Sequence, residues 1–99
     1  MARLVITMRA ARDAAAIISM LTDSAGAEVA ERYRREIDAL YDRLSMFPRS
    51  GAPRPSFGSR ARIGVVSPYV VIYDYRPNVV LILRILDGRR NITRRLVRQ

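Results

Sequence analysis

Apolar side chains recur at helical spacing in two consecutive stretches of the N-terminal half. Between Ala10 and Thr22 they fall at positions i, i+3, i+4 and i+7, which places them on one face of a helix. This first stripe consists of Ala14, Ile17, Ile18 and Leu21. A longer stripe predicts a second helix from about Ala27 to Phe47. It consists of Ala30, Tyr33, Ile37, Leu40, Leu44 and Phe47.

The residues between and after these stripes indicate where the helices end. The segment Asp23-Ser24-Ala25-Gly26 favours a break, and a link of four residues predicts that the two helices form an antiparallel hairpin. The segment from Pro48 to Pro55 contains three of the five prolines of the chain. Because proline cannot continue a helix, we expect the second helix to end there and a stiff surface loop to follow.

Four short runs are rich in β-branched and aromatic residues and predict strands. They are Leu4 to Thr7, Arg60 to Val66, Tyr69 to Tyr75 and Val79 to Leu86. Turns are expected at Ser67-Pro68 and at Arg76-Pro77-Asn78, where proline fixes φ and asparagine tolerates a left-handed backbone. The last run is apolar at every position except Arg84, so we expect it in the centre of the sheet with both faces covered.

The element order β-α-α-β-β-β predicts a single α+β domain that spans residues 1–99. In this fold an N-terminal strand and an antiparallel helical hairpin precede a three-stranded antiparallel meander, and the strands form a curved sheet. The hairpin covers one face of the sheet. No further chain is expected to cover the other face, which indicates that a partner molecule binds there.

The composition narrows the chemistry that the chain can perform. It has no Cys and no His, so a disulfide scaffold is excluded, and the usual neutral-pH base and the commonest metal ligands are missing. We expect no metal site and no cofactor. All 18 basic residues are Arg and the net charge is +9, which favours an acidic protein or a nucleic acid as partner. No segment has the length and apolar character of a membrane span, and we expect a cytoplasmic protein.

Several residues allow both a structural and a functional interpretation. Arg84 interrupts an apolar strand, so it either pairs internally with Asp74 or Asp87 or contacts a partner on the open face. Met20 lies just off the stripe of the first helix and could line a partner groove. Tyrosines share one face of the second meander strand and either pack in the core or form a stacking platform for bases. They are Tyr69, Tyr73 and Tyr75. The basic tail from Arg89 to Gln99, which contains five arginines and no acid, is either a frayed terminus or a docking element.

Short segments along the whole chain resemble the RelE/ParE family of toxins. They are Met46 to Gly51, Arg60-Ala61-Arg62, Tyr69 to Tyr75 and Val80 to Arg90. The resemblance implies a toxin that a co-expressed, acidic, ParD-like antitoxin neutralises by wrapping its C-terminal segment around the toxin in a hetero-oligomer. An antitoxin that wraps the toxin fits the uncovered face of the sheet, and Met20 of the first helix could form part of its groove. The antitoxin-binding candidates are Met20, Arg62, Tyr73 and Arg84.

The family contains two kinds of toxin, and the residues present favour one of them. RelE-like members cleave mRNA on the ribosome, and here Arg62, Arg84 and Arg90 could supply their positive charge. The family's tail tyrosine is missing: its expected position falls near Leu96, and no Tyr follows Tyr75. Arginine cannot replace it, because arginine stays protonated and is a poor base. ParE-like members instead inhibit DNA gyrase by binding and need no catalytic group, so we predict a ParE-like toxin that is not an enzyme.

On this interpretation the basic tail contacts the target. The target-binding candidates are Arg89, Arg90, Arg94 and Arg95. A RelE-like endoribonuclease remains the second hypothesis. A non-toxic basic binding module is the third.

Overall fold

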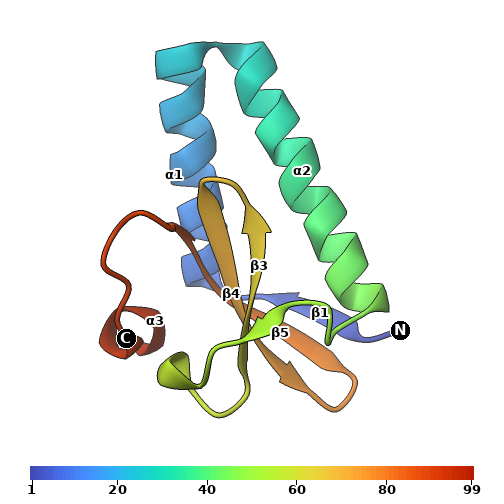
Figure 1. Cartoon of the computed structure of the whole chain (residues 1–99). Coiled ribbons are helices and arrows are strands. Elements are labelled where there is room, and N and C mark those ends of the chain that lie inside the picture. Colours follow the sequence, from blue (N-terminus) through green and yellow to red (C-terminus); the bar gives the residue numbers. More distant parts are fainter.

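The computed structural model describes residues 1–99 and has the predicted α+β fold, with a helical hairpin packed on a mixed sheet (Figure 1). The helices are α1 (Met8–Ala25), α2 (Ala27–Met46) and a short C-terminal α3 (Arg94–Arg98). The strands are β1 (Arg3–Ile6), β2 (Ala52–Pro53), β3 (Ala61–Val66), β4 (Tyr69–Arg76) and β5 (Val79–Asp87). A 3₁₀ turn, η1 (Pro55–Phe57), precedes β3. None of the helices combines the length and hydropathy that crossing a membrane requires.

The sheet contains five strands in the order β1-β5-β4-β3-β2. The meander β3-β4-β5 is antiparallel as predicted, and β1 pairs in parallel with β5, with Leu4 opposite Val80. The apolar strand β5 therefore lies between two neighbours, which confirms its expected position inside the sheet. The predicted turn at Asn78 is also present, with a φ of 61°. The strand β2 was not predicted, because it spans two residues of the proline-rich loop.

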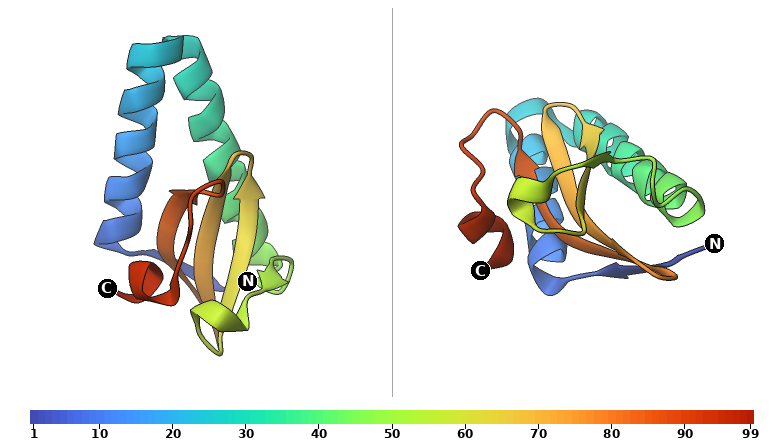
Figure 2. Two further views of the ribbon diagram at one scale, coloured as in Figure 1. Left: turned by 60° about the vertical axis from the view of Figure 1, so that its left-hand side comes forward. Right: turned by 60° about the horizontal axis from the view of Figure 1, so that its bottom comes forward.

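The helical hairpin is tighter than its sequence indicates. The hydroxyl of Thr7 caps α1 by accepting a hydrogen bond from the Ala10 N–H. The expected four-residue link is wrong, because Asp23 to Ala25 remain helical and Gly26 alone connects α1 to α2. Gly26 has a φ of 97°, which favours glycine, and its N–H donates to the carbonyls of Leu21 and Thr22. The tip of the hairpin extends beyond the sheet (Figures 1 and 2).

The main core lies between the hairpin and one face of the sheet. The predicted stripe of α2 supplies Ile37, Leu40 and Leu44, each at most 4% exposed. The prediction for Phe47 is wrong: it is 61% exposed, because α2 ends at Met46 and the backbone of Phe47 is no longer helical. Tyr41 occupies a buried position that the stripe did not include.

The C-terminal segment covers part of the other face of the sheet. Val97 of α3 packs against Ile72 and Leu86, and all three side chains are buried. The expectation that no chain remains to cover this face is therefore wrong for the part of the sheet beneath α3. The views of Figures 1 and 2 place α3 beside the sheet, at the end of the molecule opposite the hairpin tip.

A β-bulge in β5 determines the direction of Arg84. Ile72 of β4 pairs with Arg84, whereas the next residue, Tyr73, pairs with Ile82, so Leu83 has no partner across the strands. An extra residue reverses the alternation of faces beyond it. Strict alternation along the sequence would predict that Arg84 shares a face with Ile82. This is wrong, because the bulge places Arg84 on the face of Ile72.

Candidate partner-binding surfaces

Arg84 is held inside the molecule by Asp13 of α1. Its Nε donates to Asp13 Oδ2 at 2.7 Å and its Nη2 donates to Asp13 Oδ1 at 3.0 Å. Its Nη1 donates to the carbonyl of Leu96 at 2.9 Å. The side chain is 11% exposed, and its hydrogen bonds to Asp13 raise the pKa of the guanidinium. Internal pairing was one of the two interpretations of Arg84, but the expected partners, Asp74 and Asp87, are wrong.

The pair of Asp13 and Arg84 lies beyond the point where β1, the neighbouring strand of β5, ends. The strand β1 ends opposite Ile82, so the backbone beyond that residue needs other partners. The hydroxyl of Thr7 donates to the Leu83 carbonyl, and the N–H of Ile85 donates to Asp13 Oδ2 at 3.0 Å. Arg84 therefore joins α1, the edge of β5 and α3. The sequence gives little indication that Asp13 is a structural partner: it is an acidic residue beside the apolar stripe of α1.

A groove runs between α1 and the adjoining ends of β4 and β5. We call it the α1–β5 groove; it encloses about 320 Å³. It brings together four of the residues predicted to bind partners: Met20, Arg84, Arg89 and Arg90. Apolar side chains including Ile17 and Tyr69 complete its walls, and Met20 is 48% exposed. The groove therefore combines apolar surface with positive charge.

The charges at the mouth of the groove are arranged by Asp87 and Arg89. Arg89 Nη2 donates to Asp87 Oδ2 at 2.6 Å, and the Arg89 N–H donates to Asp87 Oδ1 at 2.9 Å. The hydrogen bonds from the Arg89 guanidinium and N–H lower the pKa of the Asp87 carboxyl to about 2. Arg90 is exposed and forms no ion pair. It presents its full charge to a partner.

Arg62 and Tyr73 lie away from this groove and hold the loop that follows α2. The Tyr73 hydroxyl donates to the Pro48 carbonyl at 2.6 Å and accepts from the Gly51 N–H at 3.0 Å. Arg62 Nη1 donates to the Gly51 carbonyl at 2.7 Å. Tyr73 is fully buried, and burial raises the pKa of its hydroxyl. It offers no surface to an antitoxin, and the hypothesis of a stacking platform is wrong, because Tyr69 is buried as well.

The three arginines considered for RNA cleavage are not brought together. Paired residues of neighbouring strands project to the same face of a sheet. Arg62 pairs with Tyr73, which packs in the core beneath the hairpin, whereas Arg84 pairs with Ile72 on the other face. Arg90 lines the same groove as Arg84, and Arg62 does not. The positive charges therefore do not converge on one scissile bond.

A second hollow lies beside α3 and contains Arg94, one of the predicted target contacts. We call it the α3 hollow; it encloses about 280 Å³, and no hydrophobic side chain lines it. At its base Arg98 donates two hydrogen bonds of 2.8 Å to the buried carboxylate of Asp74. Its other lining residues are Gly58, Ser59, Arg60 and Arg76. Arg95 is exposed and lines neither the groove nor the hollow.

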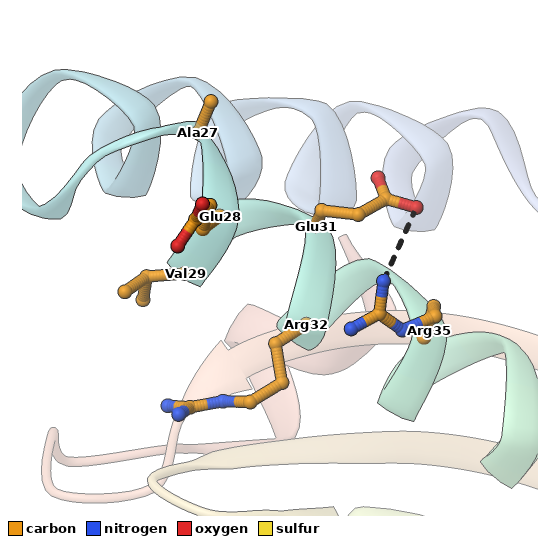
Figure 3. Close-up of a pocket in the computed structure, with 6 residues that line it drawn as sticks. All are labelled: Ala27, Glu28, Val29, Glu31, Arg32 and Arg35. Atoms are coloured by element: carbon orange, nitrogen blue, oxygen red, sulfur yellow. Dashed lines mark ion pairs between the residues drawn. The ribbon is translucent and has the colours of Figure 1, made fainter.

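A third hollow, near the tip of the hairpin, contains none of the predicted residues. It lies at the start of α2, where Glu28 and Glu31 accompany Arg32 and Arg35 (Figure 3). Arg35 and Glu31 approach to 3.9 Å. The two acids balance the two arginines, so this hollow has no excess of charge.

Comparison with known proteins identifies the family. Residues 4–92 match the family described as the ParE toxin of the type II toxin–antitoxin system parDE. The chain belongs to the ParE toxin family. It is 33% identical over 96 residues to Toxin ParE3 of Caulobacter vibrioides, an alignment that covers 97% of this chain and 96% of that protein. These findings confirm the resemblance to the ParE branch.

A solved structure from a ParDE system has the same fold. It belongs to the chromosomal ParDE toxin–antitoxin system from P. aeruginosa. It superimposes with a TM-score of 0.73 at 28% identity, and the match covers 86% of this chain and 94% of that chain. The ParE family match includes Met20, Arg84, Arg89 and Arg90 and stops at residue 92, before α3 begins. Arg94 and Arg98 of the α3 hollow thus lie beyond the end of the family match, although the alignment with Toxin ParE3 includes Arg94.

Proposed function

We propose that this ParE-family toxin inhibits DNA gyrase by binding to it in the cytoplasm, and that an acidic ParD-like antitoxin neutralises it. The family match over residues 4–92 is the observation that carries the proposal. The similarity to the P. aeruginosa structure supports it, because that chain is part of a ParDE toxin–antitoxin system.

The chemistry of the chain supports binding over catalysis. Cleavage of RNA next to a ribose 2′-hydroxyl needs a group that accepts a proton and positive charge that converges on the phosphate. The chain has no His, and no Tyr follows Tyr75. Arg62 and Arg84 lie on opposite faces of the sheet and are committed to internal hydrogen bonds. A RelE-like ribonuclease is therefore the weaker alternative.

The α1–β5 groove is the surface on which we place the antitoxin. Its apolar wall at Met20 and its cations at Arg89 and Arg90 match an amphipathic, acidic segment. Arg84 shapes the wall of the groove through Asp13. Because the same groove holds two of the arginines that we assign to the target, an antitoxin bound there covers them. Neutralisation then follows from occlusion of the target-binding residues.

The double substitution Arg89→Glu/Arg90→Glu tests this proposal. Both side chains are exposed, so the fold is expected to survive while toxicity is lost. The matched control is Arg32→Glu/Arg35→Glu near the hairpin tip, which changes the net charge equally and should stay toxic. The measurement is growth after induction in a bacterial host, together with a DNA-damage reporter and mapping of mRNA ends.

Three results would contradict the proposal. If induction of the wild-type chain produced cleaved mRNA without a DNA-damage response, the chain would be a RelE-like ribonuclease. If induction had no effect on growth, the non-toxic binding module would be favoured. If the Arg89/Arg90 variant stayed fully toxic, these residues would not be the target contact.

A further inference from the structure

The α3 hollow gathers exposed arginines from three segments that are distant in the sequence. Arg60 precedes β3, Arg76 ends β4, and Arg94 begins α3. The Tyr75 N–H donates to the Arg60 carbonyl at 3.1 Å, which fixes the first two segments side by side. All three arginine side chains are exposed.

The single acid of the hollow leaves most of this charge uncompensated. Asp74 is 1% exposed, and both its oxygens accept hydrogen bonds from Arg98. Arg76 approaches Asp74 only to 3.7 Å, and Arg60 and Arg94 form no ion pair. After Asp74 and Arg98 neutralise each other, the three exposed arginines remain.

The ion pair at the base also holds α3 in place. Arg98 Nε donates to the Phe57 carbonyl at 2.7 Å, so its guanidinium links α3 to η1 as well as to β4. Gly58 lies against this guanidinium, and a side chain there would collide with it. Arg94 is therefore held beside Arg60 and Arg76 before any ligand arrives, which lowers the entropy that binding must overcome.

The lining of the hollow indicates what it binds. Protein interfaces are built around an apolar centre, whereas interfaces with nucleic acids are polar and positively charged. The α3 hollow has no hydrophobic lining residue, in contrast to the α1–β5 groove. The hollow of Figure 3 also contains arginines, but two glutamates balance them. Arginine forks suit phosphate oxygens.

We propose that the α3 hollow binds the phosphate backbone of duplex DNA through Arg60, Arg76 and Arg94. The role of this contact rests on the proposed function: gyrase acts on DNA, and the hollow would hold the toxin on the DNA that gyrase handles. The site lies at the end of the molecule opposite the hairpin tip.

Direct binding of a mixed-sequence, fluorescently labelled DNA duplex to the purified chain tests this inference without gyrase. The variant is Arg60→Gln/Arg94→Gln, which spares Arg98 and Asp74. The matched control is Arg32→Gln/Arg35→Gln, which removes the same charge from the hollow of Figure 3. Circular dichroism and thermal melting verify that both variants are folded.

We expect the Arg60/Arg94 variant to bind the duplex at least tenfold more weakly, and the control to stay within about threefold of wild type. The slope of log affinity against log salt concentration should fall by about two in the first variant, because two phosphate contacts are lost. The inference is wrong if the wild-type chain does not bind DNA at low salt, or if the two variants bind alike. It is also wrong if the first variant keeps DNA binding and loses affinity for the antitoxin.

A separate gyrase assay distinguishes this inference from the proposed function. A chain that binds DNA through the hollow but leaves gyrase active would refute the proposed function and support the DNA site. If the chain inhibits gyrase while the Arg60/Arg94 variant and its control bind DNA equally well, the proposed function is supported and the DNA site is refuted.

Discussion

Arg84 carries a positive charge into a position where its side chain is only 11% exposed. Removing such a charge from water is costly unless a partner of opposite sign and further hydrogen bonds replace the solvent. Asp13 and the Leu96 carbonyl provide both, and Asp13 also accepts from the N–H of Ile85. This single pair therefore joins α1, β5 and α3, and both of its residues line the α1–β5 groove.

Replacing Arg84 by Ala should lower the free energy of unfolding by about 3 kcal/mol, because it leaves the Asp13 carboxylate without its cation. Urea unfolding of the single variants and of the Arg84→Ala/Asp13→Ala double variant measures the coupling between them. We expect the double variant to be less destabilised than the sum of the two single variants. Additive effects would show that the pair contributes nothing.

The substitution Arg89→Ala provides the matched control for this measurement. Arg89 also forms a short ion pair with a carboxylate, Asp87, but its side chain is 77% exposed. Water screens such a pair, so its loss should leave the unfolding midpoint unchanged within error.

The sequence predicted that Arg84 needs a partner but not which one. Asp13 lies 71 residues away, and neither composition nor periodicity connects two positions at that separation. The bulge at Leu83 adds a second obstacle, because it reverses the face on which Arg84 lies and has no recognisable sequence signal. Phe47 illustrates a boundary effect: the helix ends one residue before the last member of its stripe.

At the scale of elements, α3 has more influence than its five residues suggest. It covers the apolar surface of Ile72 and Leu86 with Val97, and it neutralises the buried Asp74 with Arg98. Its position also determines where Arg94 lies. The helix thus stabilises the sheet and completes the α3 hollow at the same time.

Deleting residues 93–99 should therefore lower the free energy of unfolding by about 4 kcal/mol, because it exposes apolar surface and leaves Asp74 buried without a cation. Chemical denaturation measures the effect. The milder Val97→Ala should cost about 2 kcal/mol, because Val97 is 3% exposed, and it keeps the ion pair. Removing Gln99 alone should have no effect. An unchanged midpoint after the long deletion would mean that α3 does not dock on the sheet.

Long elements with a clear period were predictable, and short ones were not. The hairpin and the meander follow from apolar spacing, and the turn at Asn78 follows from its residue types. By contrast, β2 consists of two residues within a proline-rich loop, and α3 lies in a tail that the arginines dominate. A weak signal for α3 was present: Thr93 caps it by accepting from the Leu96 N–H, and Ile92, Leu96 and Val97 are apolar.

At the scale of the whole molecule, two surfaces of different character carry part of the net charge of +9. The α1–β5 groove joins apolar side chains to Arg89 and Arg90 and suits a protein segment. The α3 hollow is lined by polar and charged residues and suits phosphate. The carboxylates that line these surfaces, Asp13, Asp87 and Asp74, each accept hydrogen bonds from an arginine. These internal pairings support the proposal that the molecule acts through the contacts it makes.

Inhibition of purified gyrase tests this account most directly. Relaxed plasmid, gyrase and ATP are incubated with increasing amounts of the chain, and mRNA is followed in a parallel reconstituted translation reaction. We expect supercoiling to fall with toxin dose and to recover when the antitoxin is added, while the mRNA stays intact. Undiminished supercoiling together with cleaved mRNA would contradict the central claim that this chain acts by binding.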